Sequence, residues 1–365
     1  MTSPTDRIAV LGTGLIGTSI ALAAARVGGR VTGWDARDDV AARAASRGRF
    51  ASVPTMEEAV DGADIAVVAT PIASIADVTV RALAADPSVV VTDVGSIKSR
   101  VIRDVAEAAS SHDISRFVPG HPMGGGERSG PDHAAASVVD GIVWVVAPHD
   151  VSSPDAVSLV ERFVEAIGAH PIRMSPTRHD RLVGFVSHLP QVASSALMGL
   201  AATEEADEPE ILLLAAGGFR DLTRLAASDP GLWSEILLAN RDEIGRAIDL
   251  YVARLLALRD RIRERDSFAV QQAFAEAKEA RLRLAAKPQV RAGVAVIQVE
   301  LADRPGALAE LTAGLGGGAL NIEDLQIVHS PEGGRGRVHL TVALSAAEQA
   351  MTVLEAGGYD PVRLA

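Results

Sequence analysis

Short apolar runs alternate with longer alanine-rich stretches along the first 150 residues of the chain. The apolar runs lie at residues 8–11, 30–34, 65–69, 89–92 and 142–146. Near-continuous apolar runs of this length are typical of strands buried on both faces, and the stretches between them have helical length. This strand–helix–strand alternation predicts an α/β fold with a doubly wound parallel sheet.

The pattern changes near residue 172 and again after residue 287. Ser175 and Pro176 read as a helix N-cap and a first-turn proline, and the periodicity from there to about Lys287 is helical. Farther on, a βαββαβ order is expected, which is ferredoxin-like. Its strands are predicted at 294–301, 322–328, 337–344 and the last residues, and its helices at 307–316 and 346–356. We therefore predict three domains, at 1–172, 173–288 and 290–365.

Composition excludes several classes of protein. The 365 residues are 48% apolar and 22% charged, which is the balance of a folded protein rather than of a disordered chain. The net charge of −12 argues against non-specific nucleic-acid binding. The absence of cysteine excludes disulfides, cysteine–zinc sites and thiol nucleophiles. No signal-peptide pattern or membrane-length apolar run is found, so we expect a cytoplasmic protein with no membrane partner.

A glycine loop directly follows the first predicted strand and opens a helix. Its residues are Gly12, Thr13, Gly14, Leu15, Ile16 and Gly17. Such glycines permit a tight turn, close approach of the backbone to a pyrophosphate, and close packing of helix on strand. Asp35, at the end of the second strand, can accept the ribose hydroxyls of NAD and would repel the 2′-phosphate of NADP; Arg37 nearby weakens this preference. The loop predicts a Rossmann-type domain that binds NAD.

Three residues near predicted strand ends are candidate functional residues. His121 lies in a Pro- and Gly-framed turn, where we expect it just past a strand of the parallel sheet, the place where such sheets bind ligands. Ser96 and Lys98 follow the strand at 89–92, and Ser96 is expected beside the nicotinamide. Lys98 is the only lysine in the first 277 residues, and it is either a ligand-binding residue or a capping one.

Polar residues in the helical block recur at helical spacing. Asp180, Gly184, Ser187 and Gln191 share one predicted helix face, with His188 beside this stripe and His179 well off it. The stripe is either a ligand-binding face or simply the solvated side of the helix. A glycine-opened turn, Gly217 to Arg224, carries two arginines and is a candidate anion site, since arginine binds carboxylates with two hydrogen bonds.

Together these motifs resemble the prephenate dehydrogenases of tyrosine biosynthesis over nearly the whole chain. The motifs are Gly12–Gly17, Ala69-Thr70-Pro71, Asp93–Lys98, Gly120–Gly130, His179-Asp180, Ser187-His188-Leu189-Pro190, Phe219–Arg224 and Asp229–Trp233. The last segment resembles an ACT domain, a module that binds amino acids where two copies meet. The residues that carry this second resemblance are Asp303, Pro305, Gly306, Ala307, Leu308, Asn321 and Ile322.

The resemblance implies oxidative decarboxylation of prephenate to 4-hydroxyphenylpyruvate with reduction of NAD. His121 matches the catalytic histidine of the family, Ser96 the serine that orients it, and Arg224 the arginine that holds a substrate carboxylate. Other expected substrate-binding residues are Asp180, Ser187, His188, Gln191, Gly217, Trp233, Glu127 and Lys98, and Thr70 and Pro71 join the cofactor-binding set. The resemblance also implies feedback inhibition by tyrosine and a homodimer formed by the helical block. The implied reaction requires no metal.

One departure from the family motif and two rival classes affect this interpretation. Many members have histidine where this chain has Gln191. Because an amide can also accept from an ammonium group, arogenate remains an alternative substrate. A β-hydroxyacid dehydrogenase would need a lysine in the helical block, where none occurs before Lys278. A non-catalytic amino-acid or redox sensor would be expected to lose His121, Ser96 or Arg224, and all three are present.

Overall fold

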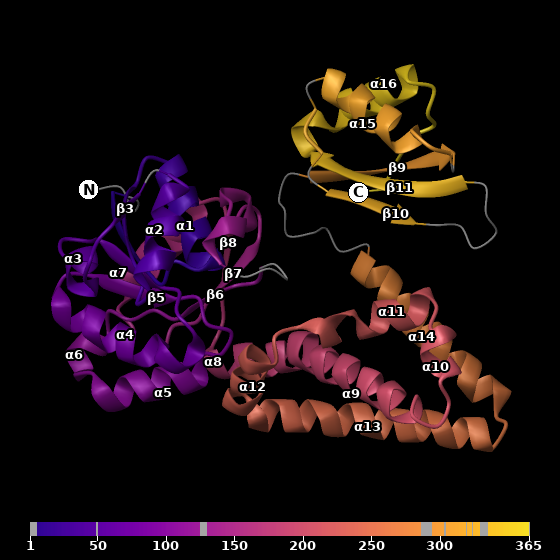
Figure 1. Ribbon diagram of the computed structural model, residues 1–365, viewed down its shortest axis with the longest axis horizontal. Helices are drawn as coiled ribbons and strands as arrows, with labels where there is room; N and C mark the ends of the chain where they lie inside the picture. The colour runs from indigo at the N-terminus through magenta and orange to yellow at the C-terminus, as the bar shows by residue number, and fades with distance from the viewer. Residues whose placement is uncertain are drawn as a thin grey trace. The chain divides into compact units, whose positions relative to one another are not determined.

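Two compact units make up the chain, residues 1–265 and residues 266–365, and each is described by itself. The structure, a computed structural model, describes residues 6–48, 50–124, 130–285, 294–302, 304–318, 320–322, 324–328 and 335–364 (Figure 1). Two predicted site residues, Glu127 and Asp303, lie outside the described residues.

A five-stranded parallel sheet forms the centre of the first unit. Its strands are β1 (Arg7–Leu11), β2 (Arg30–Trp34), β3 (Ala51–Ser52), β4 (Ile65–Val68) and β5 (Val90–Asp93), in the order β3-β2-β1-β4-β5. The connecting helices are α1 (Leu15–Arg26), α2 (Asp38–Ser46), α3 (Met56–Val60) and α4 (Ile72–Ala85). This order, with β1 central, confirms the predicted doubly wound sheet. The two-residue strand β3 was not predicted.

A separate three-stranded sheet continues the unit after α5 (Ser99–Ala108) and α6 (Ser111–Ile114). Its strands are β6 (Gly120–Pro122), β7 (Val143–Val146) and β8 (His170–Arg173), with α7 (Pro154–Ala166) between the last two. β6 runs antiparallel to β7, and His121 pairs with Val145. His121 thus lies in a short antiparallel strand rather than in the predicted turn. It does follow a segment that pairs in parallel with β5, since Phe117 pairs with Val91.

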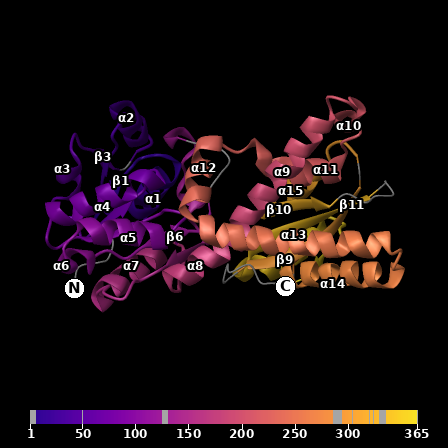
Figure 2. The same cartoon turned by 90° about the horizontal axis from the view of Figure 1, so that it is seen from below.

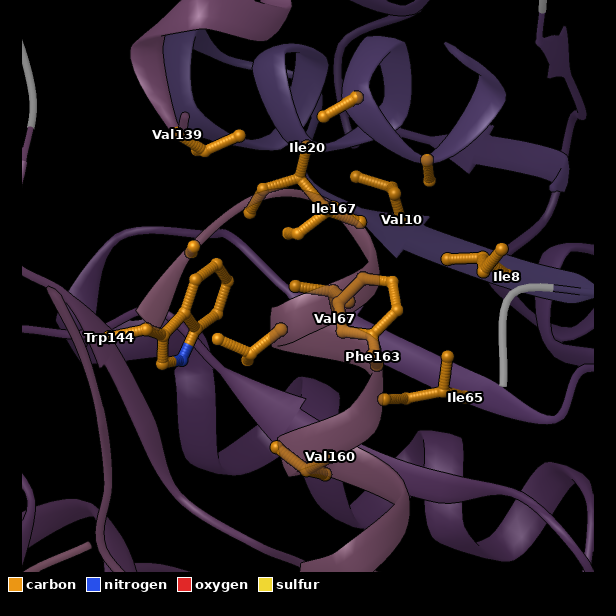
Figure 3. Packing of buried hydrophobic residues seen from close by; sticks show 14 of the residues in the cluster. Ile8, Val10, Ile20, Ile65, Val67, Val139, Trp144, Val160, Phe163 and Ile167 are labelled. Atoms are coloured by element: carbon orange, nitrogen blue, oxygen red, sulfur yellow. The ribbon is translucent and has the colours of Figure 1, made fainter. Parts of the chain in front are cut away.

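Apolar side chains fill both faces of the parallel sheet. On one face, Trp144, Phe163, Ile20 and Val67 are fully buried among the side chains of α1, α7 and the central strands (Figure 3). A second cluster, with Phe117, Met56 and Leu83, packs on the other face. Burial on both faces explains why the strand sequences are almost continuously apolar. The carboxyl ends of β1, β4 and β5 lead into the loops that carry Gly12, Thr70 and Ser96.

The helical part of the first unit begins at the N-cap Ser175, whose side chain accepts from Arg178 N, and at Pro176, as predicted. Its helices are α8 (Pro176–Val183), α9 (Leu189–Glu204), α10 (Glu210–Leu213), α11 (Gly217–Thr223), α12 (Pro230–Ala239) and α13 (Arg241–Arg263). Residues Gly184–His188 form a π-helical turn that joins α8 to α9. The long helix α13 packs on α8, on the π-helical turn and on α9 (Figures 1 and 2).

The second unit contains α14 (Ser267–Ala285) and a four-stranded antiparallel sheet. Its strands are β9 (Val294–Ala302), β10 (Asp324–Val328), β11 (Arg335–Ala343) and β12 (Val362–Arg363), in the order β10-β11-β9-β12. Helices α15 (Ala307–Gly317) and α16 (Ala347–Ala356) cover one face of this sheet (Figure 1). The βαββαβ prediction is confirmed. The predicted domain boundaries at 172, 288 and 290 stay predictions.

Candidate active site

The glycine loop has the geometry that its sequence predicts. Gly12 has a φ of +97°, and a Cβ there would lie 2.6 Å from the carbonyl oxygen of Ala69. A Cβ on Gly17 would collide with the carbonyl oxygen of Gly12, whereas the position of a Cβ on Gly14 faces open space. The loop is thus closed toward the protein and open at Gly14, where α1 begins and its free N–H groups can meet an anion.

Asp35 binds the glycine loop as well as standing where a ribose is expected. Its Oδ2 accepts a hydrogen bond of 2.8 Å from the backbone N of Thr13, and its Oδ1 accepts from Arg37 N at 3.0 Å. A carboxylate has about four lone-pair positions, so acceptor capacity remains for ribose hydroxyls. The side chain of Arg37 is exposed two residues farther on.

Replacing Asp35 tests this part of the site. We expect Asp35→Ala to raise KM for NAD⁺ and to reduce the preference for NAD⁺ over NADP⁺, because both the ribose acceptor and the tie to Thr13 are lost. KM for the second substrate should change little. Steady-state kinetics with both cofactors measure this, and Asp61→Ala, an exposed carboxylate just before β4, is the control. A variant with unchanged cofactor preference would remove Asp35 from the site.

Thr70 and Pro71 lie at the carboxyl end of β4, against the glycine loop. Thr70 Oγ1 is buried, and no hydrogen-bond partner for it exists among the described residues. A buried hydroxyl in this state calls for a ligand or water as its partner. Pro71 is the N-cap of α4, and the backbone N of Thr70 borders the Gly12 turn. A bound dinucleotide fits three features of this region: the glycine turn, the open space at Gly14, and the buried hydroxyl of Thr70 that has no partner among the described residues.

A buried ion pair lies beneath the loop after β5. Lys98 and Asp93 are both completely buried, and Lys98 Nζ lies 2.5 Å from Asp93 Oδ2. Lys98 Nζ also donates to the carbonyl oxygen of Gly120 at 2.6 Å, and Asp93 accepts from the backbone N of Gly95 and of Gly120. Burial lowers the pKa of Lys98, and the charge of Asp93 opposes that shift. The pair ties the Ser96 loop to the strand that carries His121.

This geometry changes the interpretation of Lys98. The sequence predicts a substrate-binding residue, but the ammonium group is enclosed by protein and already bonded to Asp93 and Gly120. Lys98 therefore supports the site from below, and the geometry does not favour the predicted contact with substrate.

His121 lies next to a second histidine from the helical part of the unit. Its Nδ1 is 2.8 Å from Nε2 of His179, and the rings meet edge to face with centroids 5.0 Å apart. His179 Nδ1 lies 2.8 Å from Oδ1 of Asp180. Burial is the main cause that holds the pKa of His121 well below its usual value of 6.5, and the electrostatic influence of His179, Lys98 and His188 on a protonated ring adds to it. His121 is therefore a neutral imidazole at neutral pH.

Ser96, expected to orient His121, makes no side-chain hydrogen bond with it among the described residues. Ser96 is half-buried in the loop after β5. Nδ1 of His121, the ring nitrogen through which a neighbouring side chain could orient the ring, already faces Nε2 of His179. The orienting role expected for Ser96 stays a prediction, and the residue lies just past the carboxyl end of β5, as expected.

The polar stripe of the helical block is mostly buried. Asp180, Gly184 and Gln191 are buried and Ser187 is half-buried, so the stripe is not a solvated face. The π-helical turn adds a residue between Asp180 and Gln191, and it brings His188 inward as well. π-helical turns are frequent at functional sites because they redirect side chains in this way.

His188 is buried between an aromatic ring and a polar amide. Its ring meets Trp233 edge to face, with centroids 6.0 Å apart, and its Nδ1 is 3.2 Å from Nδ2 of Asn240. Burial lowers the pKa of His188 to about 4, with a further contribution from His179. His188 is therefore neutral at physiological pH and can only exchange neutral hydrogen bonds with a ligand.

Gln191 supports the turn that carries Arg224. Its Nε2 donates to the carbonyl oxygen of Leu225 at 2.8 Å, and Ser194 Oγ accepts from the backbone N of Ala226. The amide nitrogen of Gln191 is thus already used in a hydrogen bond within the protein, which competes with the predicted contact to the substrate. Arg224 itself is exposed at the start of this turn, and Gly217 begins the preceding helix α11.

Three residues that the sequence analysis did not select belong to this arrangement. His179 faces His121, Asp93 holds Gly120, and Asn240 donates to the carbonyl oxygen of Asp180 at 2.9 Å. His179 and Asp93 stand in motifs already noted, beside Asp180 and within the Ser96 loop, which was the available signal. Asn240 lies between two helices, and no pattern along the chain singles it out.

Comparison with known proteins assigns the chain to a family. Residues 20–173 match the model of the prephenate dehydrogenase nucleotide-binding domain, and residues 175–276 match that of the prephenate dehydrogenase dimerization domain. A prephenate dehydrogenase of Bacillus subtilis is 31% identical over 335 residues, which cover 90% of this chain and 89% of that protein. The chain belongs to the prephenate dehydrogenase family. The predicted class, an NAD-dependent dehydrogenase, is confirmed, and so is NAD as cofactor.

Two other relatives agree with this assignment. A cyclohexadienyl dehydrogenase of Zymomonas mobilis is 32% identical, covering 78% of this chain and 98% of that protein. The crystal structure of a prephenate dehydrogenase from Aquifex aeolicus, in complex with hydroxyphenyl propionate and NAD⁺, superimposes with a TM-score of 0.71 at 26% identity. It covers 76% of this chain and 98% of that one. These matches leave the roles of individual residues as proposals.

Proposed function

We propose that this chain oxidises prephenate with NAD⁺ to 4-hydroxyphenylpyruvate and CO₂, within tyrosine biosynthesis in the cytoplasm. The observation that carries the proposal, beside family membership, is a neutral His121 held next to the loop of Ser96 at the carboxyl edge of a dinucleotide-binding sheet. The carboxyl edge is where open α/β sheets bind their ligands.

The chemistry asks little of the protein beyond position and charge. Prephenate carries a ring carboxylate, a pyruvyl group and a hydroxyl on the opposite ring carbon. NAD⁺, when bound, supplies the acceptor for the hydride on that carbon. His121 accepts the hydrogen bond of the hydroxyl as positive charge develops there, and it returns the proton to the phenol oxygen as CO₂ leaves and the ring becomes aromatic. The cofactor would be held by the Gly12–Gly17 loop, Asp35 and Thr70.

Neutral histidines suit this task because they polarise the hydroxyl without adding a positive charge beside the carbon that loses hydride. His121 and His188 both have lowered pKa values, so both remain neutral at pH 7. We assign Arg224 to a substrate carboxylate, Trp233 and His188 to the ring, and Ser187 and Gly217 to the wall of the site. Glu127 lies outside the described residues, and its place near the substrate stays a prediction.

The test is a steady-state comparison of prephenate and arogenate, each with NAD⁺ and NADP⁺, followed by NADH absorbance. We expect the highest kcat/KM for prephenate with NAD⁺. A higher kcat/KM for arogenate would assign the chain to that substrate, which Gln191 leaves open because an amide can accept from an ammonium group. No turnover with either substrate would overturn the proposal.

We infer further that the active enzyme is a homodimer formed through the helical block. The family model matched at residues 175–276 is a dimerization domain. Large apolar side chains are exposed on these helices, among them Leu213, Leu214, Leu222, Leu238 and Leu250. Exposed apolar surface of this extent is typical of a protein interface.

Among the described residues, no helix is long and apolar enough to span a membrane.

We also propose that the ferredoxin-like part of the second unit binds tyrosine as a feedback effector. Gly306, with a φ of +88°, opens α15, and Pro305 precedes it in the turn. Backbone N–H groups at such a turn can hold an amino-acid carboxylate. The predicted regulatory residues Ala307, Leu308, Asn321 and Ile322 lie on or near this turn and before β10, whereas Asp303 lies outside the described residues.

Truncation after residue 288 tests the regulatory proposal. We expect the shortened enzyme to stay active and to lose most of its inhibition by tyrosine, because the proposed effector site is removed. The coupling free energy between an effector site and an active site is typically about 1–3 kcal/mol. Dose–response curves for tyrosine on both enzymes measure this, with thermal denaturation as the control for folding. Equal inhibition of the two enzymes would place tyrosine at the active site instead.

A further inference from the structure

The carboxylate of Asp180 joins the two parts of the first unit. Its Oδ1 accepts from the backbone N of Lys98 at 2.9 Å and its Oδ2 from the backbone N of Ser99 at 2.8 Å. Burial raises the pKa of Asp180, but the hydrogen bonds from His179, Ser99 and Lys98 outweigh it, and the net pKa is lowered. Asp180 is therefore an anion, which can only accept hydrogen bonds.

An anionic Asp180 decides which nitrogen of His179 carries hydrogen. Because Asp180 Oδ1 is an acceptor 2.8 Å from His179 Nδ1, that nitrogen must be the donor. In a neutral His179, Nε2 then has only a lone pair. Nε2 of His179 faces Nδ1 of His121 at 2.8 Å, and two ring nitrogens at this distance require one hydrogen between them. That hydrogen belongs to Nδ1 of His121.

We propose that His179, oriented by Asp180, is a positioning residue that keeps His121 in the tautomer with hydrogen on Nδ1 and a free lone pair on Nε2. The lone pair on Nε2 is what the proposed function, on which this inference rests, requires for accepting the substrate hydroxyl. The opposite tautomer would present an N–H to that hydroxyl and would be a poor base. The arrangement has the same logic as a carboxylate that orients a catalytic histidine in a hydrolase triad, with one histidine inserted.

The surrounding contacts hold both ends of this chain of hydrogen bonds. Lys98 binds Asp180 through its backbone N and Gly120, the neighbour of His121, through its ammonium group. The same residue thus fixes the distance between the carboxylate and the strand of His121. The charged and titratable groups that face His121 are Lys98 after β5, His179 and Asp180 on α8, and His188 on the π-helical turn.

The tautomer can be measured without turnover. In the free wild-type enzyme with ¹⁵N-labelled histidine, we expect Nδ1 of His121 to give a protonated, pyrrole-type signal and Nε2 a bare, pyridine-type signal at pH 7. The spectrum of His121→Asn assigns these signals. Hydrogen on Nε2 of His121 in the wild type would overturn the proposal whatever the variants do, and it would say nothing against prephenate as substrate.

A variant then tests the consequence for catalysis. His179→Gln can place an amide near His121 but cannot also bond Asp180, so His121 should become a mixture of tautomers. We expect kcat to fall about 10²-fold, with KM for NAD⁺ unchanged. The matched control is His149→Gln, a half-buried histidine whose Nε2 lies 3.1 Å from the carbonyl oxygen of Phe117. A His179→Gln enzyme with wild-type kcat, or one whose His121 signals are unchanged, would contradict the role of His179.

Discussion

His121→Asn is expected to lower kcat for prephenate by about 10²–10⁴-fold and to leave KM for NAD⁺ within a few-fold of wild type, because general-base contributions have this size. Asparagine keeps a polar group in strand β6 but has no lone pair where Nε2 stands. Gly12, Asp35 and Thr70, the residues proposed to bind the dinucleotide, follow the strands β1, β2 and β4, so this replacement should not disturb them.

His112→Asn is the matched control for this experiment. His112 is exposed on α6, so its replacement should not change the kinetics. The melting temperatures of both variants show whether a loss of activity reflects unfolding. If His121→Asn retains kcat within a few-fold of wild type, His121 is not the base.

The pH profile tests the same assignment by an independent route. The pKa of His121 lies well below 6.5, chiefly because the ring is removed from water and secondarily because its protonated form would be disfavoured electrostatically beside His179, Lys98 and His188. A base must be unprotonated to act, so a lowered pKa extends activity toward acid. We expect kcat/KM for prephenate to hold its plateau as the pH falls through 6.5 and to decline only below that. An acid limb at or above pH 6.5 would contradict this environment for His121.

Local sequence patterns predicted the fold because each pattern has a local physical cause. The apolar runs of β1, β2, β4, β5 and β7 must be buried on both faces, and Gly12 and Gly17 are positions where a side chain would collide with backbone. The antiparallel strand β6 escaped prediction because its three residues, Gly120–Pro122, have no apolar run. Only its pairing with β7 makes it a strand.

The inner contacts of the site could not be predicted in this way. His179 is 58 positions from His121, and only the contact of α8 with the residues after β5, Lys98 and Ser99, brings the two rings together. The stripe on α8 and α9 was predicted with an uninterrupted α-helical period, whereas the π-helical turn at Gly184–His188 changes which residues face inward. Lys98 was selected for its rarity, and its actual partners, Asp93 and Gly120, follow from burial.

Substrate binding is expected to depend on the turn that begins at Arg224, whose backbone is hydrogen-bonded by side chains of α9. Gln191 and Ser194 on α9 bond the backbone of Leu225 and Ala226, the two residues that follow Arg224. Arg224 is the predicted partner of a substrate carboxylate. A guanidinium group binds a carboxylate with two parallel hydrogen bonds, and its long side chain loses less freedom when its backbone is fixed beforehand.

Arg224→Ala should therefore raise KM for prephenate and lower kcat/KM for prephenate roughly 30- to 900-fold, while KM for NAD⁺ stays unchanged. This factor corresponds to a loss of about 2–4 kcal/mol in transition-state stabilisation. The loss falls on KM because the carboxylate is bound as tightly before the reaction as during it, so ground state and transition state lose the same contact. Arg81→Ala is the matched control: Arg81 is an exposed arginine of α4 that pairs with Glu57, and removal of such a surface pair costs about 0–1 kcal/mol in stability and nothing in binding. Arg224→Lys separates charge from shape, since a lysine keeps the positive charge but not the paired hydrogen bonds, and it should recover only part of the loss. An Arg224→Ala enzyme with the wild-type KM for prephenate would show that the substrate carboxylates are held elsewhere.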